Sequence, residues 1–94
     1  MQSKSKPAQT VAERAHVARL HELPCAVCKT VAAPLEIHEI KQGAWFTSIP
    51  LCADCHRGSK NGLHGQRGMW RLYKMDELDA LNETLRMLAA NDAR

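Results

Sequence analysis

The sequence predicts a small α+β domain built around a bound zinc ion, and three observations lead to this fold class. The chain has 94 residues, and a domain of this size buries too little apolar surface to leave much margin against chain entropy. Its four cysteines form two closely spaced pairs. Between the pairs lie two short stretches of strand character, and the second pair opens a helical stretch. A single domain is expected over residues 10–94, after a polar, flexible tail at residues 1–9.

The first helix is predicted from its capping residues. Thr10 and Glu13 have the spacing of a capping box, and the residues after them are good helix formers. A helix is therefore expected from about residue 11 to residue 21, with His16 and His21 on its polar side. Its narrow apolar stripe would consist of Val11, Ala15, Ala18 and Leu20.

The two cysteine pairs enclose a predicted β-hairpin. Cys25-Ala26-Val27-Cys28 follows a proline and forms a tight turn in which two thiolates can bind one ion. Apolar and polar residues roughly alternate over residues 35–40, and a second run of strand character covers residues 44–49. A turn that contains Gly43 joins these two strands, and Pro50 is expected to close the second one.

Two more helices are predicted in the C-terminal half. Cys52 opens a short helix that Gly58 breaks, and residues 63–71 are basic and punctuated by glycine. Asp76 is the expected N-cap of a last helix that ends near residue 91. One face of this helix is expected to pack in the core or against a second copy of the chain in a homodimer. That face consists of Leu78, Leu81, Leu85 and Leu88.

The two C-x2-C pairs predict a closed zinc site. Four thiolates are the ligands that Zn²⁺ takes in tetrahedral structural sites, and such a site leaves no position for water or substrate. The chain has no apolar run long enough for a membrane span and no apolar signal segment at its start, so a cytoplasmic location is expected. In that reducing compartment, metal binding is favoured over disulfides. The expected ligands are Cys25, Cys28, Cys52 and Cys55.

Positive charge is concentrated next to the second cysteine pair. The net charge of the chain is only +3. Residues 55–75 nevertheless contain five cations and no acidic residue, whereas residues 76–94 contain five acidic residues and two arginines. The pattern favours a phosphate-bearing partner, with a solvated surface face as the alternative. The candidate nucleic-acid contacts are Arg57, Lys60, Arg67 and Arg71.

The order of the elements is that of a treble-clef zinc finger: a cysteine knuckle, a hairpin, and a helix whose first turn carries the second cysteine pair. This fold alone indicates no function. Three histidines are more informative, because His38 lies in the first strand, His56 follows the last cysteine, and His64 comes eight residues later. Since zinc ties the hairpin to the start of the helix, His38 and His56 are expected to face each other and form a second, open metal site.

This pattern resembles the HNH (ββα-metal) nucleases. The resemblance is carried by the first cysteine pair, His38-Glu39-Ile40, Ile49-Pro50-Leu51-Cys52 and Cys55-His56, and it covers about residues 23–66. It is closest to small phage-type HNH proteins with a four-cysteine zinc, including those similar to phage recombination-enhancement nucleases. The resemblance implies a metal-dependent endonuclease that hydrolyses phosphodiester bonds in DNA. It also implies a phage or prophage origin and action in the cytoplasm of a bacterial host.

The resemblance further implies roles for individual residues. His56 matches the helix-borne ligand of a catalytic divalent ion such as Mg²⁺, Mn²⁺ or Zn²⁺, and His64 is the expected second ligand. In one alignment of the strand, His38 is a ligand and Glu39 takes the position of the general base. In the other, His38 is the base and Ile37, which cannot bind metal, takes the ligand position.

Two neighbouring positions bear on whether such a site is active. Glu36 shares a strand face with His38 and is an additional candidate ligand. Thr47 stands where the family has an Asn that fixes the hairpin loop, and threonine lacks the paired donor and acceptor of an amide. Together with Glu39 at the base position, this favours an alternative function. The alternative is a non-catalytic treble-clef module that binds nucleic acid or a protein partner, such as a recombination or packaging protein.

The few aromatic side chains have a separate interpretation. They are expected in the core, with stacking against nucleic-acid bases as the alternative. These side chains are Trp45, Phe46 and Trp70.

Overall fold

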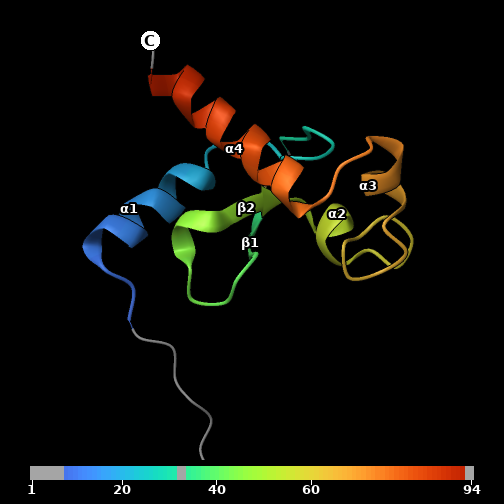
Figure 1. Cartoon of the computed structure of the whole chain (residues 1–94), viewed down its shortest axis with the longest axis horizontal. Coiled ribbons are helices and arrows are strands. Elements are labelled where there is room, and N and C mark those ends of the chain that lie inside the picture. The colour runs from blue at the N-terminus through green and yellow to red at the C-terminus, as the bar shows by residue number, and fades with distance from the viewer. Residues whose placement is uncertain (1–7, 32–33, 93–94) are drawn as a thin grey trace, which may run out of the picture.

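A two-stranded sheet lies at the centre of the molecule, with helices on three sides of it (Figure 1). The computed structural model describes residues 8–31 and 34–92, so most of the predicted tail, residues 1–7, lies outside the described residues. Helices α1 and α4 pack against β2, and α2 contacts both strands. The α+β class is confirmed. The elements are α1 (Val11–Leu20), β1 (Glu36–Glu39), the 3-10 helix η1 (Trp45–Thr47), β2 (Ser48–Leu51), α2 (Ala53–Arg57), α3 (Gly68–Leu72) and α4 (Glu77–Asp92).

The hairpin forms, but its second strand starts later than predicted. Strands β1 and β2 are antiparallel, and His38 pairs with Ile49. Most of the strand predicted over residues 44–49 is instead a 3-10 turn, because Thr47 donates from both its backbone N and its Oγ1 to the carbonyl of Ala44, at 3.0 and 2.9 Å. Pro50 does not close the strand but lies within it, opposite Ile37. Its carbonyl accepts a hydrogen bond from Ala26 at 2.9 Å, which ties the first cysteine turn to β2.

Helix α1 begins as predicted and buries a different face. Thr10 Oγ1 accepts from the backbone N of Glu13 at 3.0 Å, and Glu13 Oε1 accepts from the backbone N of Thr10 at 2.8 Å, which confirms the capping box. Of the predicted apolar stripe, only Leu20 is buried, and Val11 is 73% exposed. The stripe prediction is therefore wrong for Val11, Ala15 and Ala18, which are exposed.

His16 faces the protein, so its predicted place on the polar side is also wrong, whereas His21 is exposed as expected. The ring of His16 packs against Phe46 with 5.0 Å between centroids. Burial, and then the charge of Arg19, lower the pKa of His16. The imidazole is consequently held in its neutral form, which can replace an apolar side chain on this face.

The core joins the cysteine turn, β2 and the C-terminal helices. Its largest fully buried side chain is Trp70, whose Nε1 donates to the carbonyl of Cys55 at 2.8 Å. This bond attaches α3 to α2 and confirms that Trp70 is a core residue. Trp45 is half-buried, and the prediction that Phe46 lies in the core is wrong, because its side chain is 53% exposed beside His16.

Helix α4 starts at the predicted cap, and only part of its predicted leucine face is buried. Asp76 Oδ1 accepts from the backbone N of Asp79 at 2.8 Å, and Asp79 Oδ2 accepts from the backbone N of Asp76 at 2.9 Å. The helix packs against β2. The buried residues of the helix are Ala80, Thr84, Met87 and Leu88.

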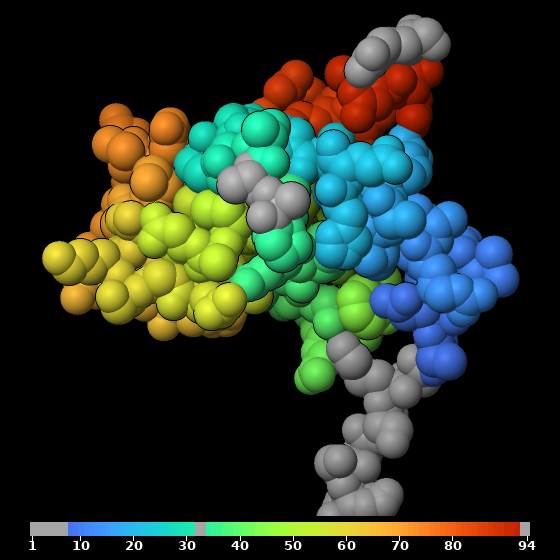
Figure 2. Space-filling view, turned by 180° about the vertical axis from the view of Figure 1, so that it is seen from behind, coloured from blue at the N-terminus to red at the C-terminus, as the bar shows by residue number. Residues whose placement is uncertain are grey.

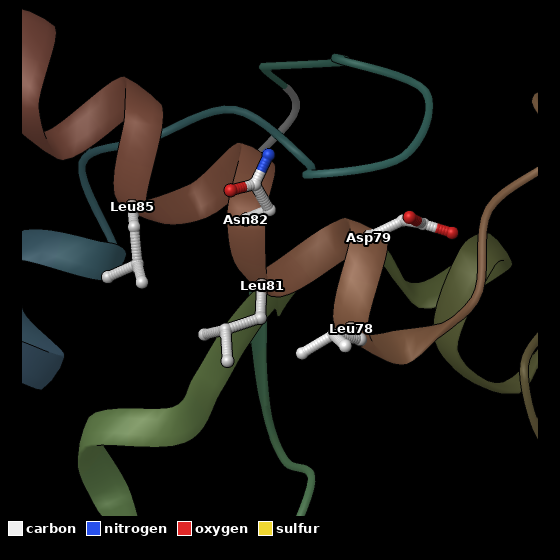
Figure 3. A pocket seen from close by; sticks show the side chains of 5 residues that line it. All are labelled: Leu78, Asp79, Leu81, Asn82 and Leu85. Atoms are coloured by element: carbon white, nitrogen blue, oxygen red, sulfur yellow. The ribbon is translucent and has the colours of Figure 1, made fainter.

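The rest of the predicted leucine face lines an open hollow of about 430 Å³ beside α4 (Figure 3). Leu78 is 70% exposed and Leu85 47% exposed, so of the two predicted alternatives, packing in the core of this chain is wrong for these two residues. The other alternative, contact with a second copy of the chain, stays a prediction. Leu81 is partly buried and packs against the core. Asp79 and Asn82 complete the lining of the hollow.

Within residues 8–31 and 34–92, the helices are all too short or too polar to cross a membrane.

Candidate metal centres

The four cysteines meet where the first turn packs against the start of α2. Each offers an Sγ within 4.8 Å of the other three, and the Sγ atoms of Cys28 and Cys52 are 3.8 Å apart. Cys25 and Cys55 are buried, and all four are free thiols. Lys29 adopts a left-handed conformation with φ 66° after the first pair, and its N donates to the Cys25 carbonyl at 3.0 Å. This compact set is compatible with a structural zinc ion, as predicted.

The surroundings of the tetrad favour one thiolate and oppose further negative charge when no cation is present. Burial acts against ionisation of Cys25, but backbone hydrogen bonds, first that of Cys52, lower its pKa. Burial, and then the charge of Cys25, raise the pKa of the Cys55 thiol. Burial is also the main reason why the pKa of Cys28 is raised. Four thiolates in this position therefore require a cation among them, which links metal binding to folding.

The three predicted histidines form a second cluster. His38 comes from β1, His56 from α2 and His64 from the loop that follows, and one ring nitrogen of each lies within 4.8 Å of the others. Their ring centroids are separated by 5.2 Å (His38 and His56), 5.4 Å (His38 and His64) and 5.0 Å (His56 and His64). His38 and His56 are half-buried, whereas His64 is exposed, so the cluster opens to solvent on one side.

Backbone hydrogen bonds place His64 over α2. The N of Leu63 donates to the carbonyl of Cys55 at 2.8 Å, and the N of His64 donates to the carbonyl of His56 at 3.1 Å. The residues after α2 form a compact lobe at one end of the molecule (Figure 2). His64 is thus attached to the helix that also carries one zinc ligand and one histidine.

Glycines make this loop tight enough to hold His64 there. A Cβ on Gly62 would lie 2.5 Å from the backbone N of Gly58, and a Cβ on Gly65 would collide with the Gly58 carbonyl oxygen. The glycine spacing of the basic run therefore has a structural purpose that periodicity in the sequence did not reveal.

Glu36 contacts the ring of His56 from outside the cluster. Its Oε1 lies 2.8 Å from His56 Nδ1, and its Oε2 accepts from Nη2 of Arg57 at 2.8 Å. Arg57, and then His56, lower the pKa of Glu36 to about 2. Glu36, a candidate ligand in the sequence, is here a carboxylate partner of a histidine, and the carboxylate leaves Nε2 of His56 available.

Glu77 contacts His38, and the sequence does not predict this contact. This first residue of α4 places Oε2 2.6 Å from His38 Nε2, with the His38 side chain 12% exposed and the Glu77 side chain 36% exposed. The two residues are far apart in the chain, and no motif spacing connects them. The sequence signal that could have indicated Glu77 was its place as an acidic residue directly after the predicted N-cap, Asp76.

Glu39 and Thr47 face the hairpin loop. Glu39 Oε1 accepts from the backbone N of Gly43 at 2.7 Å, and Thr47 closes the 3-10 turn. Glu39 follows His38 in a strand, so the two side chains point to opposite faces of the sheet. The structure therefore brings together His38, His56 and His64 and leaves Glu39 outside that cluster.

The candidate phosphate contacts have different surroundings. Arg57 is bound to Glu36, and Nε of Arg67 donates to the Leu63 carbonyl at 3.1 Å, so these two side chains help to shape the site. Lys60 and Arg71 are exposed, on the loop and on α3.

No family model, curated protein or solved structure matches the chain. The nuclease resemblance therefore rests on the motif residues themselves, and the activity that it implies is a proposal.

Proposed function

We propose that the protein is a metal-dependent HNH-type endonuclease that hydrolyses phosphodiester bonds in DNA. One observation carries the proposal: the ring nitrogens of His38, His56 and His64 converge within 4.8 Å, beside a separate four-cysteine set. Three imidazoles leave coordination positions open, as catalytic sites require, whereas four thiolates close a zinc site. Two of the three rings also contact a carboxylate, which is typical of metal-binding histidines.

The donor set indicates which ions fit. Imidazole nitrogen suits Zn²⁺ and other transition metals, whereas Mg²⁺ prefers oxygen ligands. The residues that would hold the ion are His56, His64 and, in one assignment, His38. A bound ion would supply Lewis-acid stabilisation of charge on the scissile phosphate.

His38 has two assignments in this proposal, and a metal-binding measurement separates them. If His38 is a ligand, His38→Ala lowers the affinity for the second ion. If His38 takes the proton from the attacking water, His38→Ala retains that affinity and abolishes cleavage. Glu39 is already bound to the hairpin loop, so Glu39→Gln is expected to retain cleavage, and its loss would instead favour Glu39 as the base.

The exposed cations fit a polyanionic substrate. Lys60 and Arg71 lie on the loop and the helix that follow His56, and such side chains neutralise phosphates without reading sequence. Arg57 and Arg67 are proposed to act mainly through Glu36 and the loop, because they are already bound there.

Plasmid nicking tests the proposal. Purified protein that carries one zinc ion per chain is incubated with supercoiled DNA and Zn²⁺, Mn²⁺ or Mg²⁺. We expect nicking by the wild type, its loss in His56→Ala, and wild-type activity in His21→Ala, a matched control because His21 is exposed at the end of α1. Absence of nicking with every ion, under conditions in which DNA binding is measured, contradicts the proposal.

A second candidate is a treble-clef module that binds nucleic acid without cutting it. It is supported by Glu39, which occupies the position of the family's base but accepts from Gly43 of the hairpin loop. It is also supported by Thr47, which lacks the amide of the family's Asn. This function predicts salt-dependent DNA binding that Lys60→Ala and Arg71→Ala weaken and His38→Ala leaves unchanged. Cleavage that depends on His38 excludes it.

A further inference from the structure

We infer that Glu77 is a positioning residue through which the C-terminal helix sets the tautomer and orientation of His38. The contact joins the first turn of α4 to the middle of β1, at 2.6 Å between Glu77 Oε2 and His38 Nε2. Neither the cysteine pairs nor the HNH-like motif includes α4. The inference therefore adds an element to the site.

The chemistry of the pair fixes the direction of the hydrogen bond. An ionised carboxylate can only accept, so Nε2 of His38 carries the proton of this bond, and in the neutral ring Nδ1 keeps the free lone pair. A histidine that binds a metal or accepts a proton uses only its unprotonated nitrogen, and the partner of the other nitrogen selects which one that is. Glu77 therefore assigns the reactive position of His38 to Nδ1.

The start of α4 is built to hold Glu77 in place. Asp76 and Asp79, on either side of it, bond reciprocally to each other's backbone N at 2.8 and 2.9 Å. Ala80, one turn from Asp76, is fully buried and fixes this end of the helix in the core. Glu77 is thereby held in an ordered turn, with its carboxylate directed at β1.

A parallel pair supports the same role. Glu36 approaches Nδ1 of His56 at 2.8 Å, which leaves Nε2 of that ring free. The two pairs thus release opposite nitrogens in the two rings: Nδ1 in His38 and Nε2 in His56. The tautomers follow from these contacts alone, whereas their value for catalysis rests on the proposed function.

The first test is spectroscopic and needs neither DNA nor a second metal ion. Long-range proton–nitrogen spectra of the ¹⁵N-labelled chain, carrying one zinc ion, report which nitrogen of each ring is protonated. We expect a hydrogen-bonded, exchange-protected Nε2 proton on His38 that Glu77→Ala abolishes. Leu78→Ala is the matched control, because this neighbouring side chain is 70% exposed and should leave the signal unchanged. A proton on Nδ1 of His38, or an Nε2 proton that is equally protected in Glu77→Ala, overturns the inference.

The second test measures the second metal ion by competition with a chelator, with Zn²⁺ added to protein that already carries one zinc. Loss of an outer carboxylate of a metal-binding histidine lowers affinity by about 10–100-fold. If His38 is a ligand, we expect a loss in this range for Glu77→Ala, a smaller loss for Glu77→Gln, whose carbonyl still accepts, and no change for Leu78→Ala. If His38 is the base, we expect the same ranking of the three variants in the loss of kcat for nicking, and not in ion affinity. Equal behaviour of Glu77→Ala and Leu78→Ala in both measurements contradicts the positioning role.

The outcomes separate the two proposals. A protected His38 proton that depends on Glu77, in a protein that never nicks DNA, retains the positioning role and rejects the nuclease. If Glu77→Ala nicks DNA as the wild type does, the nuclease proposal stands and the positioning role is rejected.

Discussion

Glu36 illustrates how a single carboxylate serves two neighbours. It accepts from Arg57 through both oxygens and lies 2.8 Å from His56 Nδ1. Because the pKa of Glu36 is lowered to about 2, first by Arg57 and then by His56, the carboxylate stays ionised throughout the range in which histidines titrate. Arg57, a candidate phosphate contact in the sequence, thus has a second role in maintaining this acceptor.

If the histidine cluster binds the proposed second ion, Glu36→Gln is predicted to weaken that binding without affecting the cysteine-bound zinc. The amide keeps the size of the side chain and loses the charge that orients His56. Affinity for the second ion should fall about 10–100-fold, while one zinc ion per chain is retained. Chelator competition and metal analysis measure the two effects, and an unchanged second affinity would show that Glu36 has no part in the site.

Glu83 gives a prediction about acid stability at the point where α4 pairs with the residue that follows the first cysteine turn. It pairs with Arg86 at 2.6 Å and with Lys29 at 2.8 Å, and these two partners, Arg86 first, lower its pKa from 4.5 to about 2. Since the folded state binds this proton less readily than the unfolded state, the stabilisation is complete above about pH 4.5 and is lost as the pH falls toward 2.

Glu83→Gln is therefore expected to lower the free energy of unfolding by about 1 kcal/mol at pH 7, the magnitude typical of partly exposed ion pairs. The difference from the wild type should shrink below about pH 4.5. Denaturant unfolding of both proteins at several pH values measures this difference, and because both carry the same cysteines, acid loss of zinc affects them alike. A difference that grows in acid would contradict the assignment.

Among the elements, the glycine-rich loop after α2 is the one on which the histidine cluster depends. It contributes His64, and its backbone bonds to Cys55 and His56 hold it against the helix. Its position relies on glycines at which a side chain would meet backbone atoms.

Gly65→Ala is predicted to displace His64. The added Cβ collides with the Gly58 carbonyl oxygen, which is backbone and cannot move aside cheaply. We expect a loss of about 1–3 kcal/mol in stability and at least a tenfold loss of second-ion affinity, with the cysteine-bound zinc retained. Gly43→Ala is the control: its φ of +87° makes the change strained, but nothing lies within 4 Å of the added Cβ. It should lower stability alone, and an equal loss of ion affinity in both variants would argue against a specific role of the loop.

The elements also show what sequence alone can predict. Caps and cysteine turns depend on residues three positions apart, so the capping box of Thr10, the cap at Asp76 and both cysteine pairs were predicted correctly. The buried faces of α1 and α4 depend on what packs against them. In α1 the neutral side chain of His16, and not the predicted alanines, faces the protein. In α4 Ala80 and Thr84 are buried on the side where leucines were predicted to pack.

The same distinction applies to the candidate site. His38, His56 and His64 could be found because each has a fixed relation to a cysteine pair or to the strand between the pairs. Glu77 could not, because its contact with His38 arises only when α4 packs on the hairpin.

At the scale of the whole molecule, the place of the histidine cluster depends on the cysteine tetrad. The cysteine tetrad fixes the start of α2 against the first turn and, through Ala26 and Pro50, against β2. His56 therefore depends on the tetrad for its place opposite His38. The binding free energy at structural zinc sites is on the order of 10 kcal/mol, which exceeds the net stability expected from so small a core.

Removal of zinc from the cysteine tetrad is accordingly predicted to abolish the tetrad and the histidine cluster together. With a strong chelator, circular dichroism should show loss of helix, and the resolved ring signals of the three histidines should collapse in the same transition. Restoring one equivalent of Zn²⁺ should recover both. Histidine signals that persist after the helix has been lost would show that the second cluster does not depend on the first.

The most direct test of the central claim is the count of metal ions bound by the wild type and by His56→Ala, with His21→Ala as the control. We predict one tightly held zinc ion in all three proteins and a second, weaker divalent ion in the wild type and His21→Ala only. A single zinc ion in every protein, or a second ion that His56→Ala retains with unchanged affinity, would contradict the claim that the three histidines form a metal site.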